Sequence, residues 1–181
     1  MKKTSLFLAL VLTTGALFAQ KKTTTSASIG FDATTSKDAL PIAENKTSIA
    51  ALDTKSGAVA FETVIKNFNF SNPTIQEHFN SAGWMDSEQF PVANFKGSIT
   101  NLADVKFDSN GSYNADVEGD LTIHGVTQKI KTKATIEVEG KKISSKSTFT
   151  IKLEDYKVTG KAIAAGKVSA EPSITVSAEF H

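Results

Sequence analysis

The chain has 181 residues, a formal net charge of +1 and no cysteine, and all of its twenty basic residues are lysines. The absence of cysteine excludes disulfides, thiol nucleophiles, iron–sulfur clusters and thiolate zinc sites. The near-neutral charge leaves no electrostatic footprint for nucleic acid, and a chain without arginine lacks the bidentate fork favoured in phosphate and base recognition. We therefore expect no nucleic-acid partner.

The first nineteen residues have the parts of a secretory signal peptide. Lys2 and Lys3 form a positive start, an apolar stretch runs from Leu6 to Phe18, and Ala19 is a small residue at the expected cleavage point. The apolar stretch is shorter than the roughly 20 residues that a membrane span needs. We therefore expect residues 1–19 to be removed. The mature chain should be exported, to the periplasm or outside the cell, and contain no transmembrane segment.

The next elements are predicted from hydrophobic periodicity. Residues 20–26, QKKTTTS, are polar and are predicted to be a flexible lead into one domain that covers residues 27–181. Apolar and polar residues then alternate with a period of two, which is typical of half-buried strands. The predicted strands lie near 27–35, 46–53, 58–67, 92–101, 112–124, 127–139, 142–153 and 172–180. The segment SNPTIQEHFNSAGW has possible N-cap residues followed by Pro73, and it predicts one short helix near 73–81.

The long strands between 112 and 153 are joined by tight turns, and they favour a closed barrel over a sandwich because closure leaves no strand edge exposed. The sequence therefore predicts an all-β fold, an eight-stranded antiparallel barrel. Such a barrel is either filled by side chains or able to hold one small ligand. A hollow waist of about 300–1,000 Å³ is predicted from small residues at inward-facing mid-strand positions, namely Gly97, Ala115, Gly119, Thr132, Ala134, Ser145, Ser147 and Ala178.

No pattern in the sequence points to catalysis or to a metal. The histidines His78, His124 and His181 show none of the spacings typical of metal sites. There is no G-x-S-x-G motif and no glycine-rich phosphate loop after a strand, and acids such as Asp116 and Asp120 fall on a solvent face. We expect no catalytic residue, no metal and no cofactor. His124, within GDLTIHGVTQKIK, is interpreted as the turn residue of a hairpin.

Two segments carry a resemblance to a known family. The run GDLTIHGVTQKIK, residues 119–131, resembles the signature hairpin of the YceI-like family, whose usual form is GDLTIHGVTK followed by an alternating strand. The segment HFNSAGWMDSEQFPVANFKGSI, residues 78–99, resembles the family's helix, its F-D-x-x-x-(Y/F)-P motif and the strand after it. The matching residues are His78, Phe79, Asp86, Phe90, Pro91 and Phe95. The chain lacks the family's arginine before the helix and its first-strand pattern, as a divergent branch would.

The resemblance implies a lipocalin-like barrel in an exported bacterial protein that binds amphiphilic lipids, chiefly polyisoprenoid chains, and is not an enzyme. With the apolar inward faces, it predicts a carrier or sequestering protein for a long apolar ligand. The predicted ligand contacts at the mouth of the barrel are Trp84, Met85 and Phe90. Those in its interior are Phe61, Phe95, Leu121, Ile123, Ile130, Phe149 and Ile151. The alternative is a stress-related module with a filled barrel, acting through its lysine-rich outer face at 129–133 and 141–146.

Overall fold

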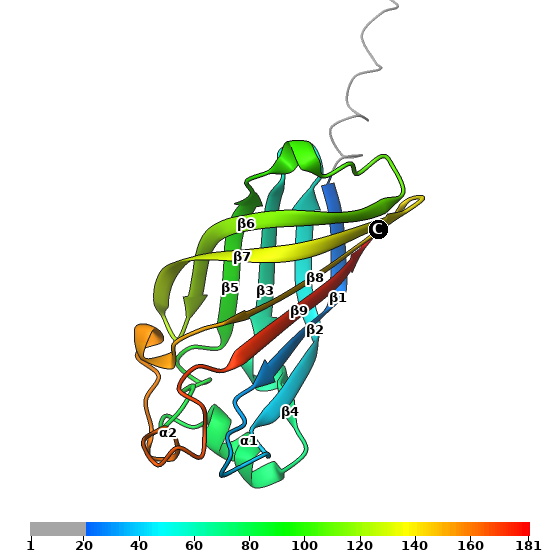
Figure 1. Ribbon diagram of the computed structural model, residues 1–181. Helices are drawn as coiled ribbons and strands as arrows, with labels where there is room; N and C mark the ends of the chain where they lie inside the picture. Colours follow the sequence, from blue (N-terminus) through cyan, green and yellow to red (C-terminus); the bar gives the residue numbers. More distant parts are fainter. Residues whose placement is uncertain (1–20) are drawn as a thin grey trace, which may run out of the picture.

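The strands of the computed structural model, which describes residues 21–181, close into an antiparallel barrel of eight strands (Figure 1). The order around the wall is β1-β9-β8-β7-β6-β5-β3-β2, and β2 pairs with β1 to complete the circle. The strands are β1 (Lys21–Asp32), β2 (Ile42–Asp53), β3 (Ala58–Val64), β5 (Val92–Ile99), β6 (Gly111–Ile123), β7 (Val126–Glu139), β8 (Lys142–Thr150) and β9 (Ser173–Phe180), with a short β4 (Asn69–Phe70) beside β2. The predicted fold class is confirmed.

The predicted flexible lead was wrong where the structure describes it. β1 begins at Lys21, and its first residues pair with the end of β2, from Lys21↔Asp53 to Thr24↔Ala50. Thr24 faces the interior and is buried. A threonine thus occupies an inward position of β1. Because the residues around it are also polar, the sequence shows no apolar–polar alternation from which this part of the strand could be predicted. The predicted signal peptide, residues 1–19, lies outside the described residues.

Tight turns set the register of the long strands. Ile123 pairs with Val126 across the turn between β6 and β7, and the two turn residues, His124 and Gly125, have φ angles of 51° and 71°. Two positive φ angles are what a type I′ hairpin turn requires. The interpretation of His124 as a turn residue is confirmed. Gly140, with φ of 62°, begins the turn between β7 and β8.

The predicted helix is α1 (Pro73–Asn80), at the lower end of the barrel in Figure 1. The Asn72 side chain caps it by accepting hydrogen bonds from the backbone N–H groups of Thr74 and Ile75, at 2.9 and 3.3 Å. Pro73 occupies the first helical position, where its missing N–H has no partner to lose. The shorter elements are α2 (Lys161–Ala164) and the 3-10 turns η1 (Ile65–Asn67), η2 (Leu102–Asp104) and η3 (Leu153–Tyr156).

The packed core is divided between the two ends of the barrel. A lower cluster beside α1 joins the rings of Phe31, Phe70, Phe79 and Trp84, whose centroids lie 4.9–6.4 Å apart. Burial in this cluster raises the pKa of Tyr156 to about 12. An upper cluster closes the opposite end, and its most buried large residues are Val138, Phe180, Leu52, Ile136 and Ile143. Between the clusters the inward side chains of β7 and β8 are only half-buried.

Candidate binding cavity

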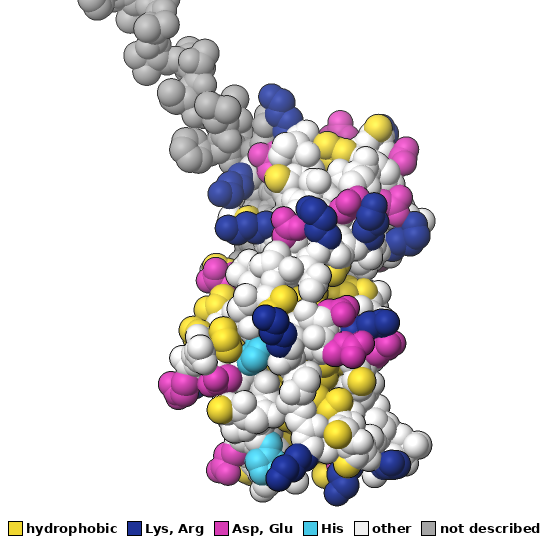
Figure 2. Space-filling view, turned by 90° about the vertical axis from the view of Figure 1, so that its left-hand side faces the viewer, with side chains coloured by type: hydrophobic (Ala, Val, Ile, Leu, Met, Phe, Trp, Pro, Cys, Tyr) yellow, Lys and Arg dark blue, Asp and Glu magenta, His cyan; other side chains and the backbone are white. Residues whose placement is uncertain are grey.

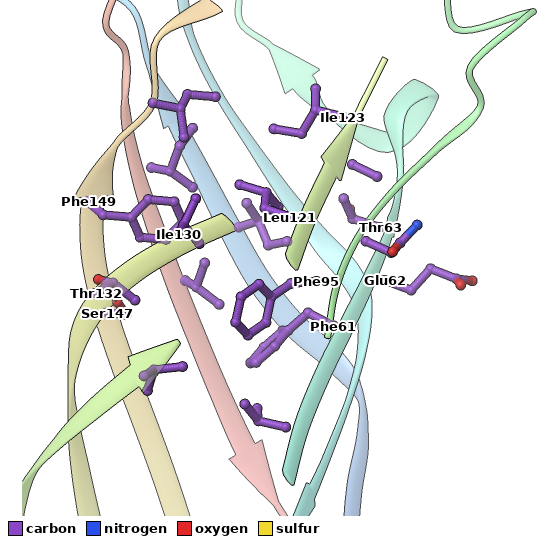
Figure 3. Close-up of a pocket in the computed structure, with 18 of the residues that line it drawn as sticks. Phe61, Glu62, Thr63, Phe95, Leu121, Ile123, Ile130, Thr132, Ser147 and Phe149 are labelled. Atoms are coloured by element: carbon purple, nitrogen blue, oxygen red, sulfur yellow. Dashed lines mark hydrogen bonds between the residues drawn. The ribbon is translucent and has the colours of Figure 1, made fainter. Parts of the chain in front are cut away.

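A cavity of about 160 Å³ occupies the waist of the barrel between the lower and upper clusters (Figure 3). All eight wall strands contribute to its lining, which is almost wholly apolar. The cavity is smaller than the range of about 300–1,000 Å³ that we expected for a small-molecule site. The rings of Phe61 and Phe95, from β3 and β5, fill part of the space inside the barrel (Figure 3).

Most of the predicted ligand contacts line the cavity, and these are Phe61, Met85, Phe95, Leu121, Ile123, Ile130, Phe149 and Ile151. Trp84 does not line it, because its ring is packed in the lower cluster 5.4 Å from that of Phe79. Phe90 lies instead at the turn between β6 and β7, with its ring 4.3 Å from that of His124. The predicted mouth built from Trp84, Met85 and Phe90 is therefore not formed. Ligand contact itself stays a prediction.

The small inward residues serve different purposes. Gly97 and Gly119 face each other across β5 and β6, and a β-carbon on either would overlap neighbouring backbone and the ring of Phe95. Glycine therefore lets this ring lie against the wall. Ala134 and Ser147 are register partners that line the cavity and leave space in it.

The remaining alanines predicted for the waist, Ala115 and Ala178, are 1% and 6% exposed and belong to the upper cluster. Ala115 is the register partner of Ala134 across β6 and β7. The closed end of the barrel and its hollow waist therefore meet at this pair of neighbouring alanines.

β7 and β8 separate at the level of the cavity. Their pairing runs from Glu139↔Lys142 to Ala134↔Ser147 and stops there, although β7 continues to Val126 as the partner of β6. Figure 1 shows the two strands diverging below this point. We call this gap, between residues 126–133 of β7 and 148–150 of β8, the β7–β8 fork.

Polar contacts hold the fork at its two ends. At the upper end, Ser147 Oγ donates to the backbone oxygen of Lys133 at 2.8 Å and lies 3.0 Å from Thr132 Oγ1. At the lower end, Gln128 Nε2 donates to the backbone oxygen of Asp155 in η3 at 2.9 Å. Residues on both sides of the fork, including Ile130 and Phe149, line the cavity. The fork is thus a part of the cavity wall without a strand-to-strand ladder.

The lysines on the outer face of β7 are paired with acids of β6. The Nζ to carboxylate distances are 3.1 Å for Lys129–Asp120, 3.0 Å for Lys131–Glu118 and 2.6 Å for Lys133–Asp116, and each pair occupies directly opposed register positions. Exposed pairs of this kind contribute about 0–1 kcal/mol each. Their main effect here is to neutralise the face, and lysines and acids are likewise interspersed on the face that Figure 2 shows.

The second lysine-rich segment, residues 141–146, includes one more pair. Lys142 Nζ lies 2.7 Å from a carboxylate oxygen of Glu179 on β9. Their hydrogen bond raises the pKa of Lys142 and lowers that of Glu179. Both side chains are therefore charged near neutral pH, and each one offsets the other.

A buried polar group lies beside the cavity, and the sequence analysis missed it. Asn45, Ser48 and Thr63 are 0%, 0% and 5% exposed. A bulge in β2 brings the first two against β3, because Ala27 of β1 pairs with Ser48 and Ile29 pairs with Asn45. Thr63 lines the cavity. The sequence signal was Thr63, a polar residue at an inward position of β3. Its neighbours Asn45 and Ser48 lie on another strand and could be identified only from the structure.

Neither a metal centre nor a membrane-crossing helix is found within residues 21–181. Over that range no group of three or more His, Cys, Asp or Glu side chains is arranged to hold a metal ion. The helices there are also too short to cross a membrane.

Comparisons with known sequences give a consistent match. A family model described as a YceI-like domain matches residues 18–180. A UPF0312 protein of Pseudomonas putida (strain W619) is 31% identical over 104 residues, which cover 54% of this chain and 50% of that protein. A UPF0312 protein of Pseudomonas syringae pv. tomato is 34% identical over 90 residues, covering 46% and 43%. The chain thus spans about half the length of the curated relatives it matches.

Solved structures share the fold. A polyisoprenoid binding domain from Saccharophagus degradans has a TM-score of 0.74 at 13% identity, covering 90% of this chain and 98% of that one. BcnA of Burkholderia cenocepacia has a TM-score of 0.56 at 16% identity, covering 90% and 97%. A YCEI protein of Campylobacter jejuni has a TM-score of 0.52 at 18% identity, covering 99% and 98%. The likeness covers at least 90% of this chain and 97% of the other chain in each case.

Proposed function

The chain belongs to the YceI-like domain family, and we propose that it is an exported, non-catalytic binding protein for a long apolar or amphiphilic lipid of the polyisoprenoid kind. The ligand is held in the waist of the barrel, in a carrier or sequestering role. The observation that carries this proposal is the apolar cavity between two packed clusters. The Saccharophagus degradans domain is described as a polyisoprenoid binding domain, and this description supports the proposed ligand class.

An apolar lining suits such a ligand energetically. Each methylene that leaves water for an apolar site contributes about 0.8 kcal/mol, so a hydrocarbon chain gains affinity along its length without specific polar contacts. A cavity of about 160 Å³ accommodates a segment of a long chain rather than all of it. The rest of the ligand has to leave the waist, and the β7–β8 fork is a part of the cavity wall where no strand ladder has to be broken.

The alternative, a filled barrel acting through a lysine-rich surface, has less support. The outer lysines of β7 are each opposed by a carboxylate of β6. An anionic partner would therefore have to displace these acids, while the cavity would remain without a purpose.

Two measurements test the proposed function. The first is lipid extraction and mass spectrometry of the protein purified from its native host, where a co-purifying polyisoprenoid or similar amphiphile is expected. The second is titration with a fluorescent long-chain lipid, where saturable binding is expected. A protein that carries no lipid and leaves the fluorescent lipid free would overturn the proposal in favour of the surface module.

Export is tested separately. We expect the intact mass of the protein recovered from the periplasm or medium to correspond to cleavage after Ala19. A recovered form that still contains Lys2 and Lys3 would contradict this cleavage.

A further inference from the structure

The lower end of the barrel exposes two large apolar side chains. Leu40 and Ile42, which are 47% and 50% exposed, flank the buried Pro41 where the loop after β1 enters β2. The backbone N–H of Ala33 donates to the backbone oxygen of Pro41 at 2.9 Å and holds this segment against the end of β1. Exposed apolar residues that gather at one place among charged residues are typical of contacts with proteins or membranes.

The same end of the barrel is rich in lysine. The segment 157–170, which contains α2, carries Lys157, Lys161 and Lys167 and no acid. Lys37, in the loop between β1 and β2, is the fourth lysine at this end. All four residues are exposed, and none of them forms an ion pair within residues 21–181. Their charges are therefore available to an external anion.

Hydrogen bonds join the β1–β2 loop to α2. Lys37 Nζ donates to the backbone oxygen of Ala165 at 3.0 Å, and Thr35 Oγ1 donates to that of Gly166 at 2.9 Å. The loop that carries Leu40 is thus fixed to the lysine-rich segment. The Lys37 ammonium has three hydrogens, so two of them remain for an anion. We call residues 33–42 and 157–170, at the lower end in Figure 1, the basic tip.

The basic tip is positive in a chain that is slightly negative as a whole. Without Lys2 and Lys3, the chain has 18 lysines against 19 acids. The basic tip has four lysines and one acid, Asp38, whose Oδ1 accepts a hydrogen bond from the backbone N–H of Leu40 at 2.9 Å. The neighbouring α1 adds one more acid, Glu77, so the lower end stays positive. Figure 2 shows lysines and hydrophobic side chains together at this end.

We infer that the basic tip docks on a bilayer that contains anionic phospholipids, with Leu40 and Ile42 in the headgroup region and the lysines at the phosphates. Burial of apolar side chains and attraction of lysines to an anionic surface both favour this contact. Nucleic acid has no use for the apolar side chains, and the chain has no arginine with which to grip phosphate bidentately. The inference goes beyond the proposed function, because docking depends on the surface of the barrel and not on its cavity.

The basic tip adjoins the lower end of the β7–β8 fork. Gln128 of β7 donates to the backbone oxygen of Asp155 in η3, and the segment 157–170 follows η3 directly. A protein that stands on a bilayer with this tip therefore has the lower end of the fork close to the membrane surface. Docking and exchange of a lipid ligand then take place at the same end of the molecule.

Cosedimentation with phospholipid vesicles tests the contact. The wild type should bind phosphatidylcholine vesicles that contain phosphatidylglycerol, more weakly at high salt, and should not bind vesicles of phosphatidylcholine alone. Lys161→Glu/Lys167→Glu reverses two charges of the basic tip and should weaken binding about tenfold or more. The control Lys141→Glu/Lys146→Glu makes the same change of net charge at two exposed lysines of the β7–β8 hairpin that also lack ion pairs within residues 21–181. It should bind like the wild type.

A fluorescent label shows which end of the barrel touches the bilayer. The chain has no cysteine, so Leu40→Cys can carry a single environment-sensitive nitrobenzoxadiazole group. Its emission should shift to the blue with anionic vesicles, because the label enters the headgroup region. Ala103→Cys, in the exposed η2 at the opposite end, carries the same label as a matched control and should show no shift.

The cavity is measured separately, without vesicles, by titration with the apolar dye N-phenyl-1-naphthylamine. Both double variants should bind this dye like the wild type, because their substituted residues do not line the cavity, and dye binding also shows that they are folded.

The two possible failures are distinguishable. If the wild type does not bind anionic vesicles, if both double variants lose vesicle binding equally, or if the label in Leu40→Cys shows no shift, the inference is overturned and the proposed function stands. If the dye does not bind, the proposed function fails, whereas the vesicle experiments still decide the inference.

Discussion

Phe90 lies against the turn between β6 and β7, where its ring contacts His124 and covers Gly125. Gly125 has φ of +71°, and an added β-carbon there would lie 2.6 Å from Cε1 of Phe90. Gly140, in the next hairpin, has φ of +62° and open space around the same position. Both turns thus need glycine for their conformation, but Gly125 is also required by the packing of Phe90.

This difference can be measured with matched substitutions. Gly140→Ala should cost about 1–2 kcal/mol, the usual penalty for a left-handed residue with a β-carbon. Gly125→Ala should cost more than that, because the Phe90 ring must also move. Urea denaturation gives both free energies of unfolding. Equal losses would show that the packing of Phe90 on the turn contributes nothing to stability.

The turn residue His124 has φ of 51°, and its ring lies against that of Phe90. His124→Ala should cost about 0.5–1.5 kcal/mol through the lost contact with the Phe90 ring, because histidine and alanine both carry a β-carbon in this left-handed conformation. His124→Asn should cost less, since asparagine before glycine suits this turn. Neither change should affect lipid affinity, because His124 does not line the cavity. A large loss of affinity in a folded His124→Ala variant would reveal a binding role for this side chain.

At the scale of secondary structure, the two halves of β7 differ in the strands with which they pair. Its upper half pairs on both sides, while its lower half pairs only with β6. Both ends of the barrel are closed by packed side chains. A ligand that enters through an end has to break one of these clusters, whereas the fork requires only side-chain movement. We therefore expect exchange of ligand through the fork.

A reversible crosslink tests this route. Lys133 and Thr148 stand one step beyond the last paired residues, Ala134↔Ser147, and the chain has no cysteine of its own. Oxidised Lys133→Cys/Thr148→Cys should close the fork by one register step. It should slow dye association and release by the same factor, leaving Kd unchanged, because a gate alters the barrier rather than the bound state. Reduction should restore both rates, and either single variant serves as control. Unchanged exchange kinetics in the oxidised form would rule out the fork as the route.

For the molecule as a whole, the decisive property is that the barrel is packed at its ends and hollow between them. Ala115 and Ala134 face each other across β6 and β7, yet the first is enclosed in the upper cluster and the second lines the cavity. A space accepts added methylenes where a packed core does not. The same substitution at these two positions therefore distinguishes a hollow barrel from a filled one.

Ala134→Leu should keep or raise the melting temperature and weaken dye binding, because the new side chain occupies ligand space. Ala115→Leu should cost about 1–3 kcal/mol through overpacking and retain binding when the protein is folded. Thermal melts and dye titrations on both variants provide the comparison. A loss of stability in Ala134→Leu as large as that in Ala115→Leu would mean that the waist is already full.

Local sequence patterns were enough to predict most of the strands, the helix α1 and the class of fold. Alternation with a period of two is a property of a single pleated strand, so inward residues such as Leu121, Ile130 and Phe149 could be assigned without knowing their neighbours. The turn residues between β6 and β7 required only the local φ preferences of glycine and its predecessor. Two motifs were enough to suggest the family, whose model matches residues 18–180.

How much space remains among these residues depends on how the strands pack together in three dimensions. A cavity depends on what all the wall strands contribute to one volume, and for this reason inward alanines of similar sequence context became core at Ala115 and lining at Ala134. The fork exists because β7 extends beyond its pairing with β8, which depends on strand pairing rather than composition. The buried hydrogen bonds of Thr63 depend on a bulge in β2 that brings Asn45 and Ser48 to it from a different strand. The local periodicity of a strand contains no information on contacts between residues that are distant in the sequence.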